Sequence, residues 1–364
     1  MRPSHALVDL GALRRNLRRA VHLAPGSKNV AVVKANGYGH GMVEAARALG
    51  PEANALAVAT LEEAVALREA DIAGPVLVLQ GPSDATDIEE AAVRDFWLMV
   101  HEPGQAERIA ASKHGPIQTW LKIDSGMHRL GFLPDDAAAA IDRLVESSAP
   151  DRAPVLCTHL ACADDLDSPT TEHQLRRFET VARAFNLQRS IANSAGIMHW
   201  PASHADWNRP GIMLYGCEPT GTFGNESELE AVMTVRSEII AVREIAAGEG
   251  VGYGHRWTAE RPARIGTVSI GYGDGYPRHA PNGTPVWVNG ERAPLAGTVS
   301  MDMITVDLTG RDDVRVGDPV ELWGPNLPVA EVAQHAGTIG YDLLAGMTSR
   351  LPRIYVNESA GMTR

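Results

Sequence analysis

The sequence lacks the features that mark secreted, membrane-spanning and nucleic-acid-binding proteins. It has 3 cysteines in 364 residues, too few for a disulfide framework. No apolar run is long enough to span a bilayer, and the first residues contain no apolar segment of signal-peptide length. Lys and Arg number 33 against 45 Asp and Glu, and the net charge of −12 disfavours nucleic acid and anionic membranes as partners. We therefore expect a cytoplasmic protein without nucleic-acid or membrane partners.

The three cysteines do not form a metal-binding pattern either. Cys157 and Cys162 flank His159, but Cys217 is far away in sequence, and the paired short spacings of zinc sites are missing. We expect thiols packed in a core and no metal. The chain also shows no internal repeat and no low-complexity tract.

Short apolar runs alternate with helical segments along the first two thirds of the chain. Hydrophobic residues make up 44% and charged residues 21%, the balance of a globular protein with an ample core. Near-continuous apolar strands separated by helices indicate a parallel sheet covered on both faces. Eight runs favour a closed (β/α)₈ barrel over an open doubly wound sheet; they cover residues 30–34, 56–60, 76–80, 96–100, 119–124, 155–160, 190–193 and 211–215.

The pattern changes after residue 215. Residues 216–227 are rich in Gly, Thr and polar residues and are typical of a linker. Short strands with turn residues between them follow, including the hairpin signal Asn289-Gly290. We predict a barrel over residues 1–227 and a mainly β domain over residues 228–364.

A lysine stands at the end of the first predicted barrel strand. Residues 31–41 read AVVKANGYGHG, so that Lys34 follows a buried strand and precedes a glycine-rich turn. An amine that is desolvated there has a lowered pKa and can act as a nucleophile or base. Two alternatives are a surface lysine and a phosphate-binding turn of a dinucleotide enzyme, with Glu62 or Glu63 as its acidic partner. The glycines lack the spacing of the dinucleotide motif.

Other polar residues also follow predicted strands. Lys122 and Asp124 end the fifth run, His159 ends the sixth, and Ser194 with Gly196 follows the seventh. Barrel enzymes carry their chemistry at this end of the strands, and the loops after strands seven and eight often bind phosphate. A phosphate site together with a lysine suggests pyridoxal 5′-phosphate (PLP) held by Lys34 as a Schiff base.

These segments resemble the alanine racemases. Residues 31–41 are similar to the PLP-attachment signature of that family, and ordered similarity covers nearly the full length. The other matching segments are residues 121–132 (LKIDSGMHRLGF), 193–196 (NSAG), 209–216 (RPGIMLYG), 252–254 (GYG), 270–278 (IGYGDGYPR), 297–302 (GTVSMD) and Tyr341.

The resemblance implies a role for each matching residue. Lys34 binds PLP covalently, Arg129 contacts its phenolic oxygen and the substrate, Lys122 positions Arg129, and Arg209 faces the pyridine nitrogen. The phosphate ligands it implies are Tyr38, Ser194, Gly211, Ile212 and Tyr341. Without the resemblance, Arg209 is expected to be a loop surface charge, because it precedes the eighth run.

The resemblance also implies a two-base reaction in a homodimer. Racemisation needs a base on each face of the substrate, and the family uses Lys34 for D-alanine and Tyr253 for L-alanine. A phenol with its ordinary pKa near 10 is a poor base at neutral pH, because ionising it three pH units below that pKa costs about 4 kcal/mol. It therefore needs cations nearby that lower its pKa. The implied link is Arg209 through His159 to Tyr253. Tyr253 and Met301 are expected to enter the partner's barrel, where Met301 binds substrate.

Three alternatives share parts of this pattern. A PLP-binding barrel without racemase activity has no β domain, and a decarboxylase of the same plan carries a cysteine-bearing segment in the β domain, whereas all three cysteines here precede residue 218. A racemase of broader specificity differs only in substrate range. The sequence fits both supply and breakdown of D-alanine.

Overall fold

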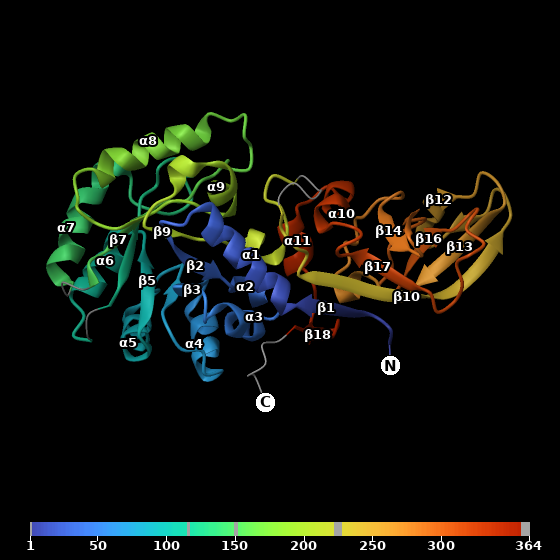
Figure 1. Cartoon of the computed structure of the whole chain (residues 1–364), viewed down its shortest axis with the longest axis horizontal. Helices are drawn as coiled ribbons and strands as arrows, with labels where there is room; N and C mark the ends of the chain where they lie inside the picture. The colour runs from blue at the N-terminus through green and yellow to red at the C-terminus, as the bar shows by residue number, and fades with distance from the viewer. Residues whose placement is uncertain (1, 115–116, 149–151, 222–227, 358–364) are drawn as a thin grey trace. The chain divides into compact units, whose positions relative to one another are not determined.

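A computed structural model describes residues 2–114, 117–148, 152–221 and 228–357. The chain forms two compact units (Figure 1). The barrel unit consists of Arg14–Gly37 and Met42–Leu214, and the β unit consists of the residues up to Leu13, Tyr38–Gly41 and the chain from Tyr215 onward. Residues 222–227 of the predicted linker lie outside the described residues.

The barrel unit contains a closed barrel of parallel strands, as predicted. Its strands are buried almost throughout, which explains why they read as continuous apolar runs in the sequence. In order around the barrel they are β2 (Lys28–Val32), β3 (Ala55–Val58), β4 (Val76–Val78), β5 (Phe96–Val100), β6 (Thr119–Lys122), β7 (Val155–Cys157), β8 (Arg189–Ser190) and β9 (Trp207–Asn208).

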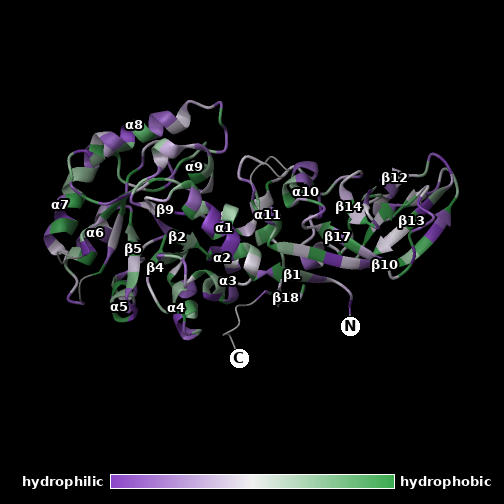
Figure 2. Cartoon of the chain, in the orientation of Figure 1, coloured by the Kyte–Doolittle hydropathy of each residue, from purple (hydrophilic) through white to green (hydrophobic). Residues whose placement is uncertain are grey.

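Helices alternate with these strands, and in Figure 2 they change repeatedly between hydrophilic and hydrophobic colour. Their first residues follow capping side chains: Thr60 before α4, Asp84 before α5, and Glu102 before α6, which has Pro103 in its first turn. The helices are α1 (Leu10–Leu23), α3 (Met42–Leu49), α4 (Leu61–Glu69), α5 (Ala85–Arg94), α6 (Pro103–Ala110), α7 (Ala137–Ser147), α8 (Thr170–Ala182) and α9 (Ser194–His199). The element α2 (Lys34–Tyr38) is a single turn with left-handed φ values.

The predicted eighth strand, residues 211–215, is wrong. The eighth barrel strand is β9, which has two residues, and it pairs with β8 at Ser190–Trp207 and with β2 at Lys28–Trp207. Residues Ile212–Tyr215 instead form a short 3₁₀ helix. A two-residue strand leaves no apolar run to detect, whereas the buried 3₁₀ helix does.

The β unit contains an eight-stranded sheet in the order β15-β14-β17-β10-β1-β18, with β13 pairing β10 and β16. Strand β1 (His5–Asp9) runs antiparallel to β10 and parallel to β18, so the first residues of the chain lie inside this sheet. The other strands of this sheet are β10 (Met233–Ile245), β13 (Ala263–Val268), β14 (Pro285–Val288), β15 (Glu291–Pro294), β16 (Ile304–Asp307), β17 (Pro319–Trp323) and β18 (Arg353–Val356). Strands β11 (Gly250–Val251) and β12 (Trp257–Thr258) form a separate two-stranded sheet.

The hairpin predicted at Asn289-Gly290 is confirmed. These two residues connect β14 to β15 with φ values of 45° and 86°, the positive pair that such a tight turn needs. Two helices, α10 (Val329–Ala336) and α11 (Gly340–Ala345), follow β17. Among the helices of the described ranges, none combines the length and the apolar character required to cross a bilayer.

Candidate active site

Lys34 begins a left-handed turn directly after β2. The residues that follow it, Ala35, Asn36, Gly37 and Tyr38, have φ values of 53°, 54°, 61° and 50°. This conformation costs a residue with an L side chain about 1–2 kcal/mol, less for Asn. Such strain collects at functional sites, where the surroundings hold it. The turn separates the end of β2 from α3 and leaves Lys34 half-buried.

The surroundings of Lys34 favour its neutral form. Burial lowers the pKa of the amine, the nearby charge of Arg129 lowers it further, and Glu63 opposes them. A lysine with a lowered pKa has more neutral amine available near physiological pH, which is the form that acts as nucleophile or base.

Lys122 lies directly before the loop after β6, and Arg129 lies within this loop. Lys122 is the last residue of β6 and is buried, whereas the Arg129 side chain is exposed in this chain. Between them, one carboxylate oxygen of Asp124 accepts three backbone N–H bonds, from Gly126, Met127 and His128, each 3.0 Å long. Asp124 thereby fixes the part of the loop that leads to Arg129.

Arg209 is buried directly after β9, at the same end of the barrel as Lys34. Its guanidinium donates to the Ser190 hydroxyl, the Thr158 carbonyl and, over 3.1 Å, the Ile191 carbonyl. The expectation of a surface charge is therefore wrong. With β9 as the true eighth strand, Arg209 obeys the strand-end rule that the misplaced strand concealed.

His159 lies beside this guanidinium, with its Nδ1 3.5 Å from the Arg209 terminal nitrogen. Burial holds the pKa of His159 well below its ordinary value, and the charges of Arg209, Lys122, Arg129 and Lys34 lower it further. The imidazole is therefore neutral, and Nδ1 accepts from Arg209 while Nε2 keeps its proton. Basic side chains from three strand ends, those of β2, β6 and β9, thus act on one neutral imidazole.

Ser194 and the loop after β9 meet at a second position of the barrel unit. The buried Ser194 hydroxyl accepts the backbone N–H of Gly211 over 2.9 Å and that of Met213 over 3.3 Å. Asn193 caps α9 by accepting from the Gly196 N–H over 2.9 Å. The hydroxyl still has a proton to donate, so this corner can bind an oxyanion such as phosphate. Ile212 is buried in the same loop.

The aromatic candidates form a separate cluster in the β unit. The Tyr38 ring stacks on Tyr215 with centroids 4.7 Å apart and lies 6.1 Å from the Tyr341 ring. Burial raises the pKa of Tyr38 beyond its ordinary value of 10, so this phenol stays protonated and can donate a hydrogen bond. Tyr38 and Tyr341, both predicted phosphate ligands, are thus neighbours.

Tyr253 and Met301 lie on the surface of the β unit. Tyr253 is 72% exposed and Met301 is 51% exposed, unusual values for large side chains with apolar surface. Hydrogen bonds hold the backbone at both residues: the Thr298 hydroxyl donates to the Tyr253 carbonyl over 3.1 Å, and the Gly273 N–H donates to the Met301 carbonyl over 2.9 Å. These residues make no described contact with Lys34.

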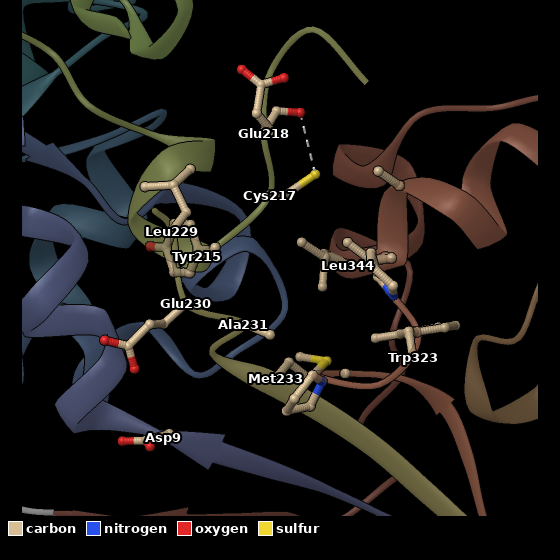
Figure 3. Close-up of a pocket in the computed structure, with 16 residues that line it drawn as sticks. Asp9, Tyr215, Cys217, Glu218, Leu229, Glu230, Ala231, Met233, Trp323 and Leu344 are labelled. Carbon is tan, nitrogen blue, oxygen red and sulfur yellow. Dashed lines mark hydrogen bonds between the residues drawn. The ribbon is translucent and has the colours of Figure 1, made fainter. Parts of the chain in front are cut away.

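Two of the three cysteines, Cys157 and Cys217, are buried thiols. Cys217 lines a cavity of about 340 Å³ in the β unit. Figure 3 shows it there with Tyr215, Trp323 and Leu344, which also line the cavity. Burial raises the pKa of the Cys217 thiol to about 12 and also raises that of Cys157. Both thiols therefore stay protonated at neutral pH and are poor nucleophiles.

Sequence reasoning did not identify the side chains that bond the backbone next to His159 and Lys34. Gln174 on α8 is buried and donates to the His159 carbonyl over 3.0 Å, while its own carbonyl accepts from the Ala161 N–H over 2.8 Å. Glu63 on α4, which the sequence offered only as the acidic partner of a dinucleotide motif, accepts the Ala35 N–H next to Lys34. A lone polar residue on the apolar face of a helix is the signal that could have found Gln174.

Comparisons with known proteins agree along the whole chain. The model of the alanine racemase N-terminal domain matches residues 8–219, and that of the alanine racemase C-terminal domain matches residues 232–355. The alanine racemase of Chromohalobacter salexigens is 50% identical over 362 residues, which cover 99% of this chain and 100% of that protein.

Solved structures show the same similarity. The biosynthetic alanine racemase of Pseudomonas aeruginosa superposes with a TM-score of 0.94 at 49% identity, over 98% of this chain and 100% of that one. The alanine racemase of Bartonella henselae, solved with covalently bound pyridoxal phosphate, superposes with a TM-score of 0.89 at 31% identity, over 98% of this chain and 100% of that one.

Proposed function

This chain belongs to the alanine racemase family and interconverts L- and D-alanine, and we propose that it does so with pyridoxal 5′-phosphate, Lys34 and the Tyr253 of a second copy of the chain. One observation carries the proposal. The strand ends bring the half-buried amine of Lys34, the buried guanidinium of Arg209 and a neutral imidazole into one cationic cluster.

The residues of the barrel unit fit this cofactor. Bound PLP supplies an aldehyde that takes up the substrate's amino group and a ring that draws electrons away from its α-carbon. The cluster of cations suits an anionic phenol and phosphate. The Ser194 hydroxyl, oriented by the Gly211 N–H that it accepts, and the Ile212 backbone would supply neutral donors for the phosphate, and we assign Gly211, Tyr38 and Tyr341 to the same group.

Lys34 serves as the base on one face of the substrate. Because burial and Arg129 lower the pKa of its amine, the neutral form can accept the α-proton of D-alanine and return a proton to the same face. The left-handed turn after Lys34 fixes the backbone from which this side chain extends at the strand end. Lys34 is also the residue to which the cofactor binds.

Arg209 and His159 set the charge at the ring nitrogen. A guanidinium donates and cannot accept, so Arg209 facing that nitrogen keeps it unprotonated, in contrast to a carboxylate. A ring without this proton withdraws electrons more weakly, which disfavours the side reaction of transamination. The neutral His159 accepts from Arg209 and offers its Nε2 proton towards Tyr253 of the second chain.

Arg129 and Met301 hold the substrate. We assign the Arg129 guanidinium to the cofactor's phenolic oxygen and to the carboxylate of alanine, and Lys122 to the positioning of Arg129. The Met301 backbone of the second chain approaches the same carboxylate. We propose that aromatic side chains near the mouth leave room for a methyl group, because larger side chains pay a steric cost.

The exposed side chains of the β unit support a homodimer. Tyr253 and Met301, both assigned to the partner's site, are exposed together with Tyr272, Met303 and Ile339. Exposed apolar and aromatic side chains of this kind mark interaction surfaces. In such a dimer each site takes Lys34 from one chain and Tyr253 from the other. We place the boundary between the two parts of the chain at residues 227 and 228, and the enzyme in the cytoplasm.

Mixing two inactive variants tests this arrangement. Lys34→Ala and Tyr253→Ala are each expected to lose turnover as homodimers, by a factor of about 10² or more for a lost base. After the mixed chains are dissociated and reassembled, a heterodimer has one site with both bases intact. A chiral assay should then recover up to half the wild-type activity per heterodimer. Confirmed heterodimers without recovered activity would show that Tyr253 does not act between chains.

A further inference from the structure

The carboxylate of Glu63 bridges two strand ends of the barrel unit. Glu63 lies in the first turn of α4, and one of its oxygens accepts the Ala59 N–H just after β3 over 2.7 Å. The other oxygen accepts the Ala35 N–H over 2.7 Å. A glutamate at this position of a helix commonly bonds the backbone N–H of its own cap residue, here Thr60. This one instead reaches the neighbouring strand.

The residue that Glu63 holds is one of two in the turn, with Tyr38, that bear the strain of a left-handed φ without a glycine or asparagine. Ala35 has a left-handed φ of 53°, and alanine has neither the freedom of glycine nor the polar side chain with which asparagine adapts to this region. The next residue, Asn36, secures the other end of the turn, because its side-chain oxygen accepts the Met42 N–H over 3.1 Å. The Glu63 bond therefore compensates the turn at a residue that does not adopt this conformation readily.

Ala35 is also the residue directly after Lys34. Fixing its N–H fixes the peptide plane that carries Lys34, and with it the direction in which the amine leaves the strand end. Three groups act on this amine or sense its charge: Arg129 from the loop after β6, His159 from the loop after β7, and Glu63 from α4. Glu63 is the negative one among them.

We propose that Glu63 is a positioning residue for Lys34: its carboxylate clamps the left-handed turn through the Ala35 N–H and balances the charge of the surrounding cations at the lysine. This proposal rests on the proposed function, in which Lys34 binds PLP. Glu63 is thereby a structural partner of the lysine and touches neither substrate nor cofactor.

Capture of the cofactor provides the test. Only the neutral amine attacks an aldehyde, and the step joins the Lys34 nitrogen to the aldehyde carbon and releases one water. The full-length protein is stripped of cofactor with hydroxylamine, dialysed and mixed with pyridoxal 5′-phosphate at a series of pH values. Absorbance gives the rate, and borohydride reduction followed by peptide mass spectrometry identifies the lysine. The rate at high pH reports positioning, and the midpoint of its pH profile reports the charge around Lys34.

Glu63→Gln removes the charge. It also replaces one of the two oxygens that accept backbone N–H groups by an amide NH₂, which can only donate. We expect its rate at high pH to fall roughly tenfold, and its midpoint to move to lower pH by about half a unit or more, because a negative neighbour is lost. The control Glu62→Gln removes the same charge from the preceding residue of the helix, whose side chain is exposed. It should change neither the rate at high pH nor the midpoint of the pH profile. Ala35→Gly in the Glu63→Gln background relieves the strain, so it should restore the rate but leave the midpoint low.

Two results would overturn the role of Glu63. One is a Glu63→Gln protein that behaves like Glu62→Gln. The other is a slower Glu63→Gln protein whose midpoint is unmoved and which Ala35→Gly does not rescue, because that pattern belongs to a general loss of stability. A wild-type protein that fails to bind the cofactor at Lys34 would instead refute the proposed function.

Discussion

Arg209 shows how single side chains set the chemistry of the barrel cluster. Burial lowers the pKa of its guanidinium, yet an arginine starts from so high a value that it stays charged. Its planar fork satisfies three acceptors, the Ser190 hydroxyl and the carbonyls of Thr158 and Ile191. A lysine has a single nitrogen and cannot reproduce this spread of donors. The charge of Arg209 in turn helps to keep His159 neutral.

Tyr253 allows the two faces of the reaction to be tested separately. Overall racemisation must slow equally in both directions in any variant, because the enantiomers have equal free energy. Exchange of the α-proton with D₂O, followed by NMR from each pure enantiomer, reports each base alone. Tyr253→Phe should slow exchange from L-alanine about 100-fold or more, as expected for a lost general base, and exchange from D-alanine by less than about tenfold. Equal slowing of the two would contradict the assignment of one base to each face.

At the scale of elements, the loop after β6 is shaped by backbone contacts at both of its ends. The Phe132 N–H donates to the Lys122 carbonyl over 2.9 Å, and the Asp124 N–H donates to the Phe132 carbonyl over 2.8 Å. Gly131 has a φ of 126°, and a Cβ there would lie 2.8 Å from the Asp124 nitrogen. The close return of the chain therefore requires glycine at this position, and it brings Arg129 back towards the strand end.

Asp124 makes the stability of this loop depend on pH. Burial raises the pKa of its carboxyl, but the backbone N–H groups of His128, Gly126 and Met127 and the charge of His128 outweigh burial, so that the pKa is lowered. The ionised carboxylate therefore stabilises the fold above its unfolded pKa, about 3.9, and this contribution is lost as the pH falls through the lower folded value.

We expect Asp124→Asn to lower the free energy of unfolding by about 1 kcal/mol at pH 7, because charge-assisted bonds become neutral ones. The difference from wild type should shrink as the pH falls through the lowered folded pKa of Asp124, and it should vanish once the carboxyl is protonated in both states. Urea unfolding across this range measures it, with the exposed Asp135→Asn as control. A difference that is constant with pH would mean that the charge of Asp124 is not what stabilises the loop.

At the scale of the whole molecule, the first and last described segments of the chain belong to one sheet. Strand β1 pairs with β10 at Val8–Met233 and with β18 at Val8–Tyr355. Its side chains alternate between half-buried and buried, and Ala6 and Val8 are fully buried. The β unit is therefore completed by residues that precede the whole barrel in sequence.

Val8→Asp should destabilise the protein strongly, because it places a carboxylate in the core of this sheet. We expect a loss of about 3 kcal/mol or more in the free energy of unfolding, measured by denaturant titration. Leu7→Asp is the matched control, since Leu7 points to the other, half-buried face. An equal loss for both variants would show that β1 contributes backbone pairing alone.

The sequence by itself determined the barrel, the β domain and the lysine motif. These features are local: buried parallel strands are continuous apolar runs, the Asn289-Gly290 turn requires its own residue types, and the lysine stands next to its glycines in the chain. Tertiary structure decided the rest. The strand before Arg209 is two residues long and exists only through its pairing with β8 and β2. The bond from Glu63 to Ala35 and the pairing of β1 join residues distant in sequence. No local pattern encodes such contacts, because they depend on where the folded chain brings two segments together.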